Sequence, residues 1–150
     1  MLSTNFLFLV LLCFGMTSVA QHNTPENFNL QLWQSSIQEA EGLEKRVLQD
    51  SLAELLVNAS DHYIQQKNYK DAIPLIHEAI SLFELKRDQQ RLSDCYSRLG
   101  ASYYRVSDYE KSQLYYFKSL NIEEEFGNTR GIAVNLEKIG EIYLLTGDLD

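Results

Sequence analysis

Few side chains in this sequence have the type and spacing that catalysis or metal binding needs. The histidines, His22, His62 and His77, are scattered along the chain, and no pair of them has the spacing of metal ligands. The sequence also contains no Gly-rich phosphate loop and no Ser/His/Asp order with a recognisable elbow. We therefore expect no catalytic residue, no metal and no cofactor, and we expect the histidines to lie at the surface or at helix edges.

Tyrosine is the most frequent aromatic residue, and five aromatic side chains gather in one stretch of the chain. They are Tyr103, Tyr104, Tyr115, Tyr116 and Phe117. Such a group can pack helices together, or it can form a stacking platform for sugar rings. No other feature of the sequence supports sugar binding, so we interpret the group as packing between helices.

The tyrosines belong to a pattern that repeats every forty residues. Tyr63, Tyr103 and Tyr143 share one register position, and Asn68, Asp108 and Asp148 share another. Small residues recur in the same register, as Ser60, Gly100 and Gly140, as Ala72 and Ser112, and as Ala79 and Ser119. Large residues interleave with them, as Leu56, Tyr96 and Leu136, with Leu99 and Ile139 one turn later. A fixed period of this size indicates a helical repeat protein, in which small residues let two helices approach closely.

Turn and cap signals divide the repeats into helices. We predict helices over about residues 50–66, 69–85 and 109–126. A further helix follows Asp88 and contains Leu92 to Val106, and another follows Asn128 and contains Ile132 to Leu144. Asp88 and Asn128 are predicted N-caps, because their side-chain oxygens can accept hydrogen bonds from exposed backbone N–H groups. Gly127 supplies a left-handed C-terminal stop. Pro74 falls early in its helix, which we expect to bend rather than break.

A polar leader and one amphipathic helix precede the repeats. Leu30, Trp33, Ile37 and Ala40 are spaced by three and four residues, as on one face of a helix. We interpret Trp33 as an anchor that packs this helix onto the repeats, and Glu41-Gly42 as its end. The predicted organisation is a signal peptide at 1–20, a leader and capping helix at 21–49, and a repeat array at 50–150 with units 50–87, 88–127 and 128–150.

The first twenty residues have the character of an export signal. They contain no Asp, Glu, Lys or Arg, and Phe6 to Met16 is an almost unbroken apolar run. That run is shorter than the roughly 20 residues that span a bilayer, and small residues at Ser18 and Ala20 suit a signal peptidase. We predict cleavage after Ala20 and a periplasmic or other extracytoplasmic location. Cys95 is then the one cysteine of the mature chain, and we expect it to be buried on a helix.

The net charge of the chain is −8. Nucleic-acid-binding surfaces need clustered basic residues, and so do segments that bind anionic membranes electrostatically. We therefore expect no nucleic-acid partner. The acidic run Glu123 to Glu125 is interpreted as the solvated end of a helix.

The repeated pattern resembles the tetratricopeptide repeat. In the middle unit the matching residues are Tyr96, Leu99-Gly100, Tyr103, Ser107-Asp108-Tyr109, Ser112, Tyr116 and Ser119-Leu120. The resemblance covers roughly residues 50–150, with a period of forty in place of the family's usual period of about 34. It implies an all-α fold, an α-solenoid of antiparallel helix pairs in a right-handed superhelix, with about two and a half repeats after the N-terminal helix.

The resemblance also implies a binding surface. In this family the first helix of each pair lines a concave face that grips peptide segments of other proteins. The matching positions are Glu54, Asp61, Ile64, Asp94, Ser97, Tyr104, Arg105, Glu141 and Leu144, with Val57, Gln65, Ala101, Val134, Glu137 and Leu145 beside them. Arg105 is the only cation placed among them, so we expect an acidic groove that favours a basic or apolar peptide. The expected function is that of an exported protein-interaction scaffold without enzyme activity.

Two other functions are consistent with the sequence. The third unit ends halfway and leaves Ile142, Leu144 and Leu145 without a partner helix. In this respect the chain resembles the N-terminal sensor region of longer bacterial membrane signalling proteins, whose histidine-kinase or transcription-regulator module would lie beyond residue 150. A glycan-uptake outer-membrane lipoprotein is a weaker alternative, because Leu12 is too bulky for a lipidation site at Cys13. A four-helix bundle without repeats would not require the forty-residue pattern.

Overall fold

The computed structural model describes residues 30–147, and these residues are almost entirely helical. The helices are α2 (Leu30–Glu39), α3 (Gly42–Gln65), α4 (Tyr69–Lys86), α5 (Gln89–Arg105), α6 (Tyr109–Phe126) and α7 (Thr129–Thr146). No strand occurs within this part of the chain, so the all-α prediction is confirmed. The predicted signal peptide, the leader and Asp148 lie outside the described residues.

The chain divides into two compact units, residues 1–55 and residues 56–150. In the first unit Trp33 is buried, and the break between α2 and α3 confirms the predicted interruption at Glu41-Gly42. The prediction that the next helix starts at Asp50 is wrong. That helix, α3, begins at Gly42, because neither Pro nor Gly interrupts the sequence from there to Gln65.

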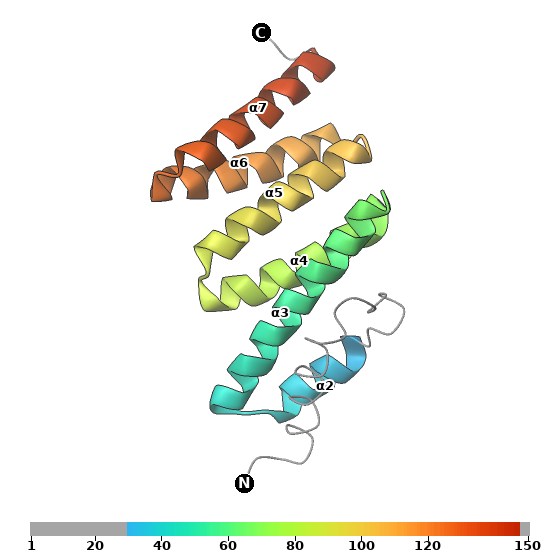
Figure 1. Ribbon diagram of the computed structural model, residues 1–150, viewed down its shortest axis with the longest axis vertical. Helices are drawn as coiled ribbons and strands as arrows, with labels where there is room; N and C mark the ends of the chain where they lie inside the picture. Colours follow the sequence, from blue (N-terminus) through green and yellow to red (C-terminus); the bar gives the residue numbers. More distant parts are fainter. Residues whose placement is uncertain (1–29, 148–150) are drawn as a thin grey trace. The chain divides into compact units, whose positions relative to one another are not determined.

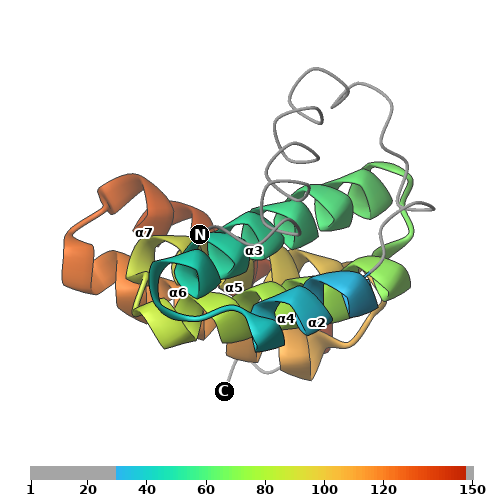
Figure 2. The ribbon, with the colours of Figure 1, turned by 90° about the horizontal axis from the view of Figure 1, so that it is seen from below.

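In the second unit the helices follow one another as a stack. The helix α5 packs against both α4 and α6, and α6 packs against α7. Figure 1 shows α4 to α7 alternating in direction along this stack, as an array of antiparallel helix pairs requires. In the view from below, along the stack, α4, α5 and α6 overlap one another (Figure 2).

The turns between the helices repeat with the same period as the sequence. Lys67, Ser107 and Gly147, forty residues apart, have φ values of 60°, 63° and 77°. Arg87 and Gly127 form a second pair, with φ values of 57° and 65°. All five residues are in the left-handed region, which ends a helix and redirects the chain. The predicted stop at Gly127 is therefore confirmed.

The predicted caps are present. The Oδ1 atom of Asp88 accepts a hydrogen bond from the Arg91 backbone N–H at 3.2 Å, and Asn128 Oδ1 accepts from Gly131 at 3.3 Å. Pro74 lies within α4, which continues through it from Tyr69 to Lys86.

Small residues mark the place where α5 and α6 approach most closely. The Tyr116 ring lies directly against Gly100, and the Ser112 hydroxyl donates a hydrogen bond of 2.7 Å to the Gly100 carbonyl oxygen. Ser112 therefore adds a bond between the helices that alanine would not make. The next layer is the α6–α7 core, formed by Tyr116, Leu120, Ile139 and Ile142.

At one position a large residue does not pack between helices as the repeat pattern predicts. Leu136 is 51% exposed, whereas Leu56 at the equivalent position is fully buried. Around Gly140, which is equivalent to Gly100, no atom beyond its neighbours and the backbone of its own helical turn lies within 4 Å of the position that a β-carbon would occupy. Both differences arise because, within the described residues, no helix covers this side of α7 as α6 covers α5.

Candidate functional site

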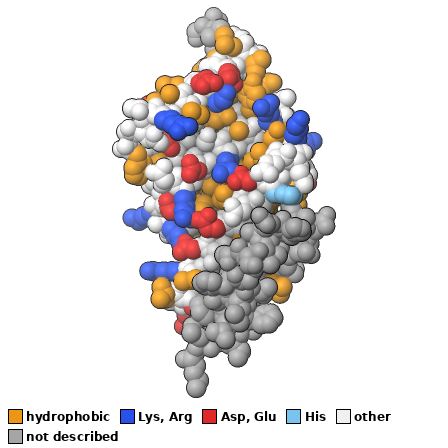
Figure 3. Space-filling view, in the orientation of Figure 1, with side chains coloured by type: hydrophobic (Ala, Val, Ile, Leu, Met, Phe, Trp, Pro, Cys, Tyr) orange, Lys and Arg blue, Asp and Glu red, His pale blue; other side chains and the backbone are white. Residues whose placement is uncertain are grey.

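The groove face is the surface of the second unit that carries the positions implied by the family resemblance. It comprises Asp61 and Ile64 on α3, Asp94, Ser97, Ala101, Tyr104 and Arg105 on α5, and Glu141 and Leu144 on α7. Asp94, Ala101, Arg105 and Leu144 are exposed, and the others are half-buried. Glu54 is exposed on α3 but belongs to the first unit. In Figure 3 acidic and basic side chains lie beside one another, with hydrophobic side chains between them.

An ion pair joins two helices across the groove face. The Arg98 guanidinium on α5 pairs with the Asp61 carboxylate on α3. Asp61 is therefore engaged within the protein, and Arg98 is a groove residue that the sequence prediction missed. The signal was present, since Arg98 is one helical turn after Asp94 and so lies on the same side of α5.

A second cation lies one repeat further along. Lys138 is forty residues after Arg98, and its Nζ atom pairs with Glu141 at 2.8 Å and with Glu137 at 3.2 Å. The prediction that Arg105 is the only cation of the groove is therefore wrong. The groove face therefore carries positive and negative side chains that are largely paired with each other. Arg98 and Lys138 share a register position that the prediction did not include.

Tyr104 and Arg105 differ in how far they are available to a partner. The Tyr104 ring makes an edge contact with Tyr109, with centroids 5.7 Å apart, and packs against the α6–α7 core. Much of that ring is therefore packed against other residues of the protein. Arg105 is exposed and forms no ion pair with any residue from 30 to 147.

Asp94 lies in an acidic neighbourhood at the other end of α5. Partial burial raises the pKa of its carboxyl group, and the charges of Glu123 and Asp88 raise it further. The same neighbours would attract a cationic group brought to this end of the face.

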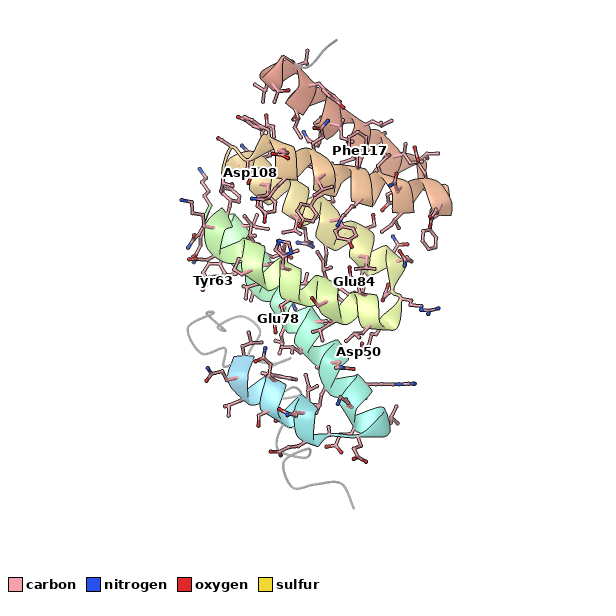
Figure 4. All side chains as sticks on the ribbon, turned by 180° about the vertical axis from the view of Figure 1, so that it is seen from behind. Asp50, Tyr63, Glu78, Glu84, Asp108 and Phe117 are labelled. Atoms are coloured by element: carbon pink, nitrogen blue, oxygen red, sulfur yellow. The ribbon has the colours of Figure 1, made fainter. Side chains whose placement is uncertain are left out.

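Aromatic side chains of α4, α5 and α6 form a cluster around Tyr115. Glu84, which accepts a hydrogen bond from Tyr96 of this cluster, is labelled in the view from behind (Figure 4). The rings of Tyr103 and Tyr115 are stacked at 5.5 Å with an interplanar angle of 5°, and Tyr96 stacks on Tyr115 at 6.1 Å. Lys118 lies over both Tyr96 and Tyr115, with its Nζ atom 5.3 Å from each ring. The faces of these rings contact one another and a lysine, which supports packing over a sugar platform.

His77 belongs to this cluster and is half-buried, at the edge of α4 and not on its open surface. Its Nε2 atom is 3.2 Å from the Tyr103 hydroxyl, and its ring makes edge contacts with Tyr103 and Tyr115. Burial lowers the pKa of His77, and the positive charge of Lys118 lowers it further. The imidazole therefore links α4 to α5 and α6 in its neutral form.

Glu123 was expected to be solvated, and this too is wrong, because its side chain is only 6% exposed. Its carboxylate accepts hydrogen bonds from the Ser93 hydroxyl and, at 2.6 Å, from the Asn128 amide. The Asn135 side-chain amide donates a hydrogen bond of 3.0 Å to the Ser119 hydroxyl oxygen, and the hydroxyl oxygens of Ser119 and Ser93 are 3.0 Å apart. This polar network joins α5, α6 and α7, and it satisfies a buried charge that would otherwise be costly.

Cys95 is buried, as predicted, and burial raises the pKa of its thiol to about 12. Such a thiol is protonated at neutral pH and is not a nucleophile. Among residues 30–147 no cluster of His, Cys, Asp or Glu has the arrangement of a metal site. None of the described helices is long and apolar enough to cross a membrane.

The stacked helix pairs, the repeated left-handed turns and the exposed face of α5 and α7 define a helical repeat protein of the solenoid class. Comparison with protein families agrees, since the model of the tetratricopeptide repeat matches residues 51–125, half of the chain. The chain therefore belongs to the tetratricopeptide repeat family, whose repeats generally mediate protein–protein interactions.

One curated relative is similar over part of its length. It is a protein of Guillardia theta with the name "Uncharacterized protein ycf37", 31% identical over 87 residues. The match covers 58% of this chain and 45% of the relative, so the chain spans less than half of that protein. No solved structure matches the chain.

Proposed function

We propose that this protein is an exported interaction scaffold that binds a segment of a partner protein on its groove face. The observation that carries the proposal is the mixed character of that face on α5 and α7. Leu144 is 72% exposed beside Glu141, and Arg105 is exposed without an ion pair among the described residues. Arginine is enriched where proteins bind one another, and an exposed leucine on the same face offers apolar area that a partner can bury.

The face is tested by comparing matched leucines. Leu144 on α7 and Leu85 on α4 are both 72% exposed, but only Leu144 belongs to the groove face. Partners captured by cross-linking to the wild-type protein should be lost with Leu144→Asp and reduced with Arg105→Ala. They should be retained with Leu85→Asp. Equal capture by all variants would contradict the use of this face.

Export is supported by the composition of residues 1–20, which combine an apolar run with small residues before Gln21. The mature protein is then expected outside the cytoplasm, without the first twenty residues. Mass spectrometry of the extracytoplasmic fraction should find an N-terminus at Gln21. Detection of the uncleaved chain in the cytoplasm alone would contradict this part of the proposal.

The uncovered side of α7 favours a second candidate, in which these repeats are the sensing part of a longer membrane signalling protein. Leu136 is exposed and the space over Gly140 is open, so a further helix can pack there as α6 packs on Gly100. Further repeats in the coding sequence, followed by an apolar span of about 20 residues, would support this candidate. A stop codon directly after Asp150 would exclude it.

A further inference from the structure

The ion pair across the groove face has an incomplete counterpart one repeat further along. Arg98 on α5 pairs with Asp61 on α3, the preceding helix of the groove. Lys138 on α7 is equivalent to Arg98, and the residue equivalent to Asp61 on α5 is Ala101. The second repeat therefore has the cation, Lys138, but lacks the carboxylate on the neighbouring helix that would pair with it.

Ala101 is exposed, and a cation follows it on the same side of α5. Its methyl group occupies little of the space that an aspartate side chain would fill. Arg105 lies one helical turn further along α5, on the same side of the helix, and has no ion pair among residues 30–147. Lys138 pairs only with carboxylates of its own helix in the described part of the chain, and such solvent-exposed pairs are weak.

Charges from both α5 and α7 act on the phenol of Tyr116. Burial raises the pKa of its phenol to about 12, while the positive charges of Lys138 and Arg105 act to lower it. The negative charge of Glu141 acts on the same phenol. A cation from α5 and a cation from α7 therefore act on one phenol, as expected if both helices contribute charge to the same face.

We propose that a bound partner supplies the missing carboxylate, as an Asp or Glu side chain placed over Ala101 between Arg105 and Lys138. This inference rests on the proposed use of the groove face. It makes the partner a peptide segment with an acidic side chain, in place of the basic or apolar peptide expected from the sequence. Glu137 and Glu141 compete with the partner for Lys138, so the ion pair with Arg105 is expected to contribute most to binding.

The test uses three peptides with acetylated and amidated ends, so that no terminal carboxylate is present. They alternate Leu with Glu, Leu with Gln, and Leu with Lys. Fluorescence anisotropy should show that the Glu peptide binds the wild-type protein on the order of fivefold more tightly than the Gln peptide, the scale of one exposed charge pair. Ala101→Asp should remove this advantage by occupying the site, and Ala101→Asn, of the same size without the charge, should keep it.

The other possible outcomes of this experiment overturn the inference. Binding of the Gln or Lys peptide as tight as that of the Glu peptide overturns the inference and leaves the groove in use. The same conclusion follows if Ala101→Asp and Ala101→Asn have equal affinities for the Glu peptide. Absence of binding by all three peptides overturns both the inference and the proposed function.

Discussion

Gly100 lies so close to Tyr116 that a β-carbon added to the glycine would be 2.9 Å from three atoms of the tyrosine ring. The ring is buried, and its neighbours in the α6–α7 core leave it little room to move. The contact sets the distance between α5 and α6. It also explains why the repeat has a small residue at this position.

Replacing Gly100 with alanine should therefore destabilise the protein, by about 1–3 kcal/mol, because the core is overpacked. Gly140 is the matched control, since no atom beyond its neighbours and the backbone of its own helical turn lies within 4 Å of its β-carbon position. There alanine should stabilise the helix by roughly 0.5–1 kcal/mol. Urea unfolding of both variants measures the difference, and a shift of the same sign in both would contradict the assigned contact.

The sequence predicted the helices and turns well because their signals are local. Tyr63, Tyr103 and Tyr143 share a register with the left-handed turns that follow them, so one period describes both packing and chain reversal. The start of α3 was missed for a physical reason. No capping residue is needed at Asp50 when Gly42 already reverses the backbone, with φ of 57°, and nothing breaks the helix after it.

The candidate site was less predictable because it depends on contacts between distant residues. Arg98 and Asp61 are on different helices, and their pairing engages one of the carboxylates on which the expectation of an acidic groove depended. Glu123 was mistaken for a surface residue because it begins an acidic run. Its burial depends on Ser93, thirty residues away on another helix, together with the nearby Asn128 amide.

The network around Glu123 suggests a second prediction, because the residues forty positions earlier in the sequence are apolar. Ser93, Ser119, Glu123 and Asn135 correspond to Ala53, Ala79, Phe83 and Cys95. Glu123→Phe alone should cost roughly 1–3 kcal/mol, since it leaves the buried Ser93 hydroxyl and the Asn128 amide without their acceptor. Thermal unfolding should show this loss.

The control for that variant is the complete exchange. Ser93→Ala, Ser119→Ala and Asn135→Cys added to Glu123→Phe remove the buried donors together with their acceptor. Stability should then recover most of the loss, because an apolar set of this kind packs as well as a satisfied polar one. No recovery in the fourfold variant would mean that size, and not unsatisfied hydrogen bonding, causes the defect.

The turn at Arg87 offers a stabilising change. Arg87 adopts a φ of 57° at the end of α4, where Gly127 occupies the equivalent position after α6. A non-glycine residue in the left-handed region costs about 1–2 kcal/mol, so Arg87→Gly should raise the free energy of unfolding by a similar or smaller amount. Gly127→Ala should lower it. If both variants have wild-type melting temperatures, backbone strain at these turns does not limit stability.

His77 should make stability depend on pH. Burial and the positive charge of Lys118 lower the pKa of His77 in the folded protein from 6.5. The other charged groups of the aromatic cluster are Lys111, which lies over the Tyr103 ring, and Glu84, which accepts a hydrogen bond from the Tyr96 hydroxyl. Above pH 6.5 the imidazole is neutral in both states, and its contribution is fully present. As pH falls below 6.5 the unfolded chain binds a proton that the folded protein resists, so stability is lost down to the folded pKa.

His77→Gln should remove this component. The difference in melting temperature between the wild-type protein and the variant should favour the wild-type protein at about pH 7.5 and shrink by about pH 5, across the range in which histidine titrates. His62→Gln is the control, because among residues 30–147 the His62 ring bonds only to Gln66 on its own helix and makes an edge contact with Tyr63. A difference between wild type and His77→Gln that stays constant with pH would show that the His77 contribution comes from packing alone and not from its neutral charge state.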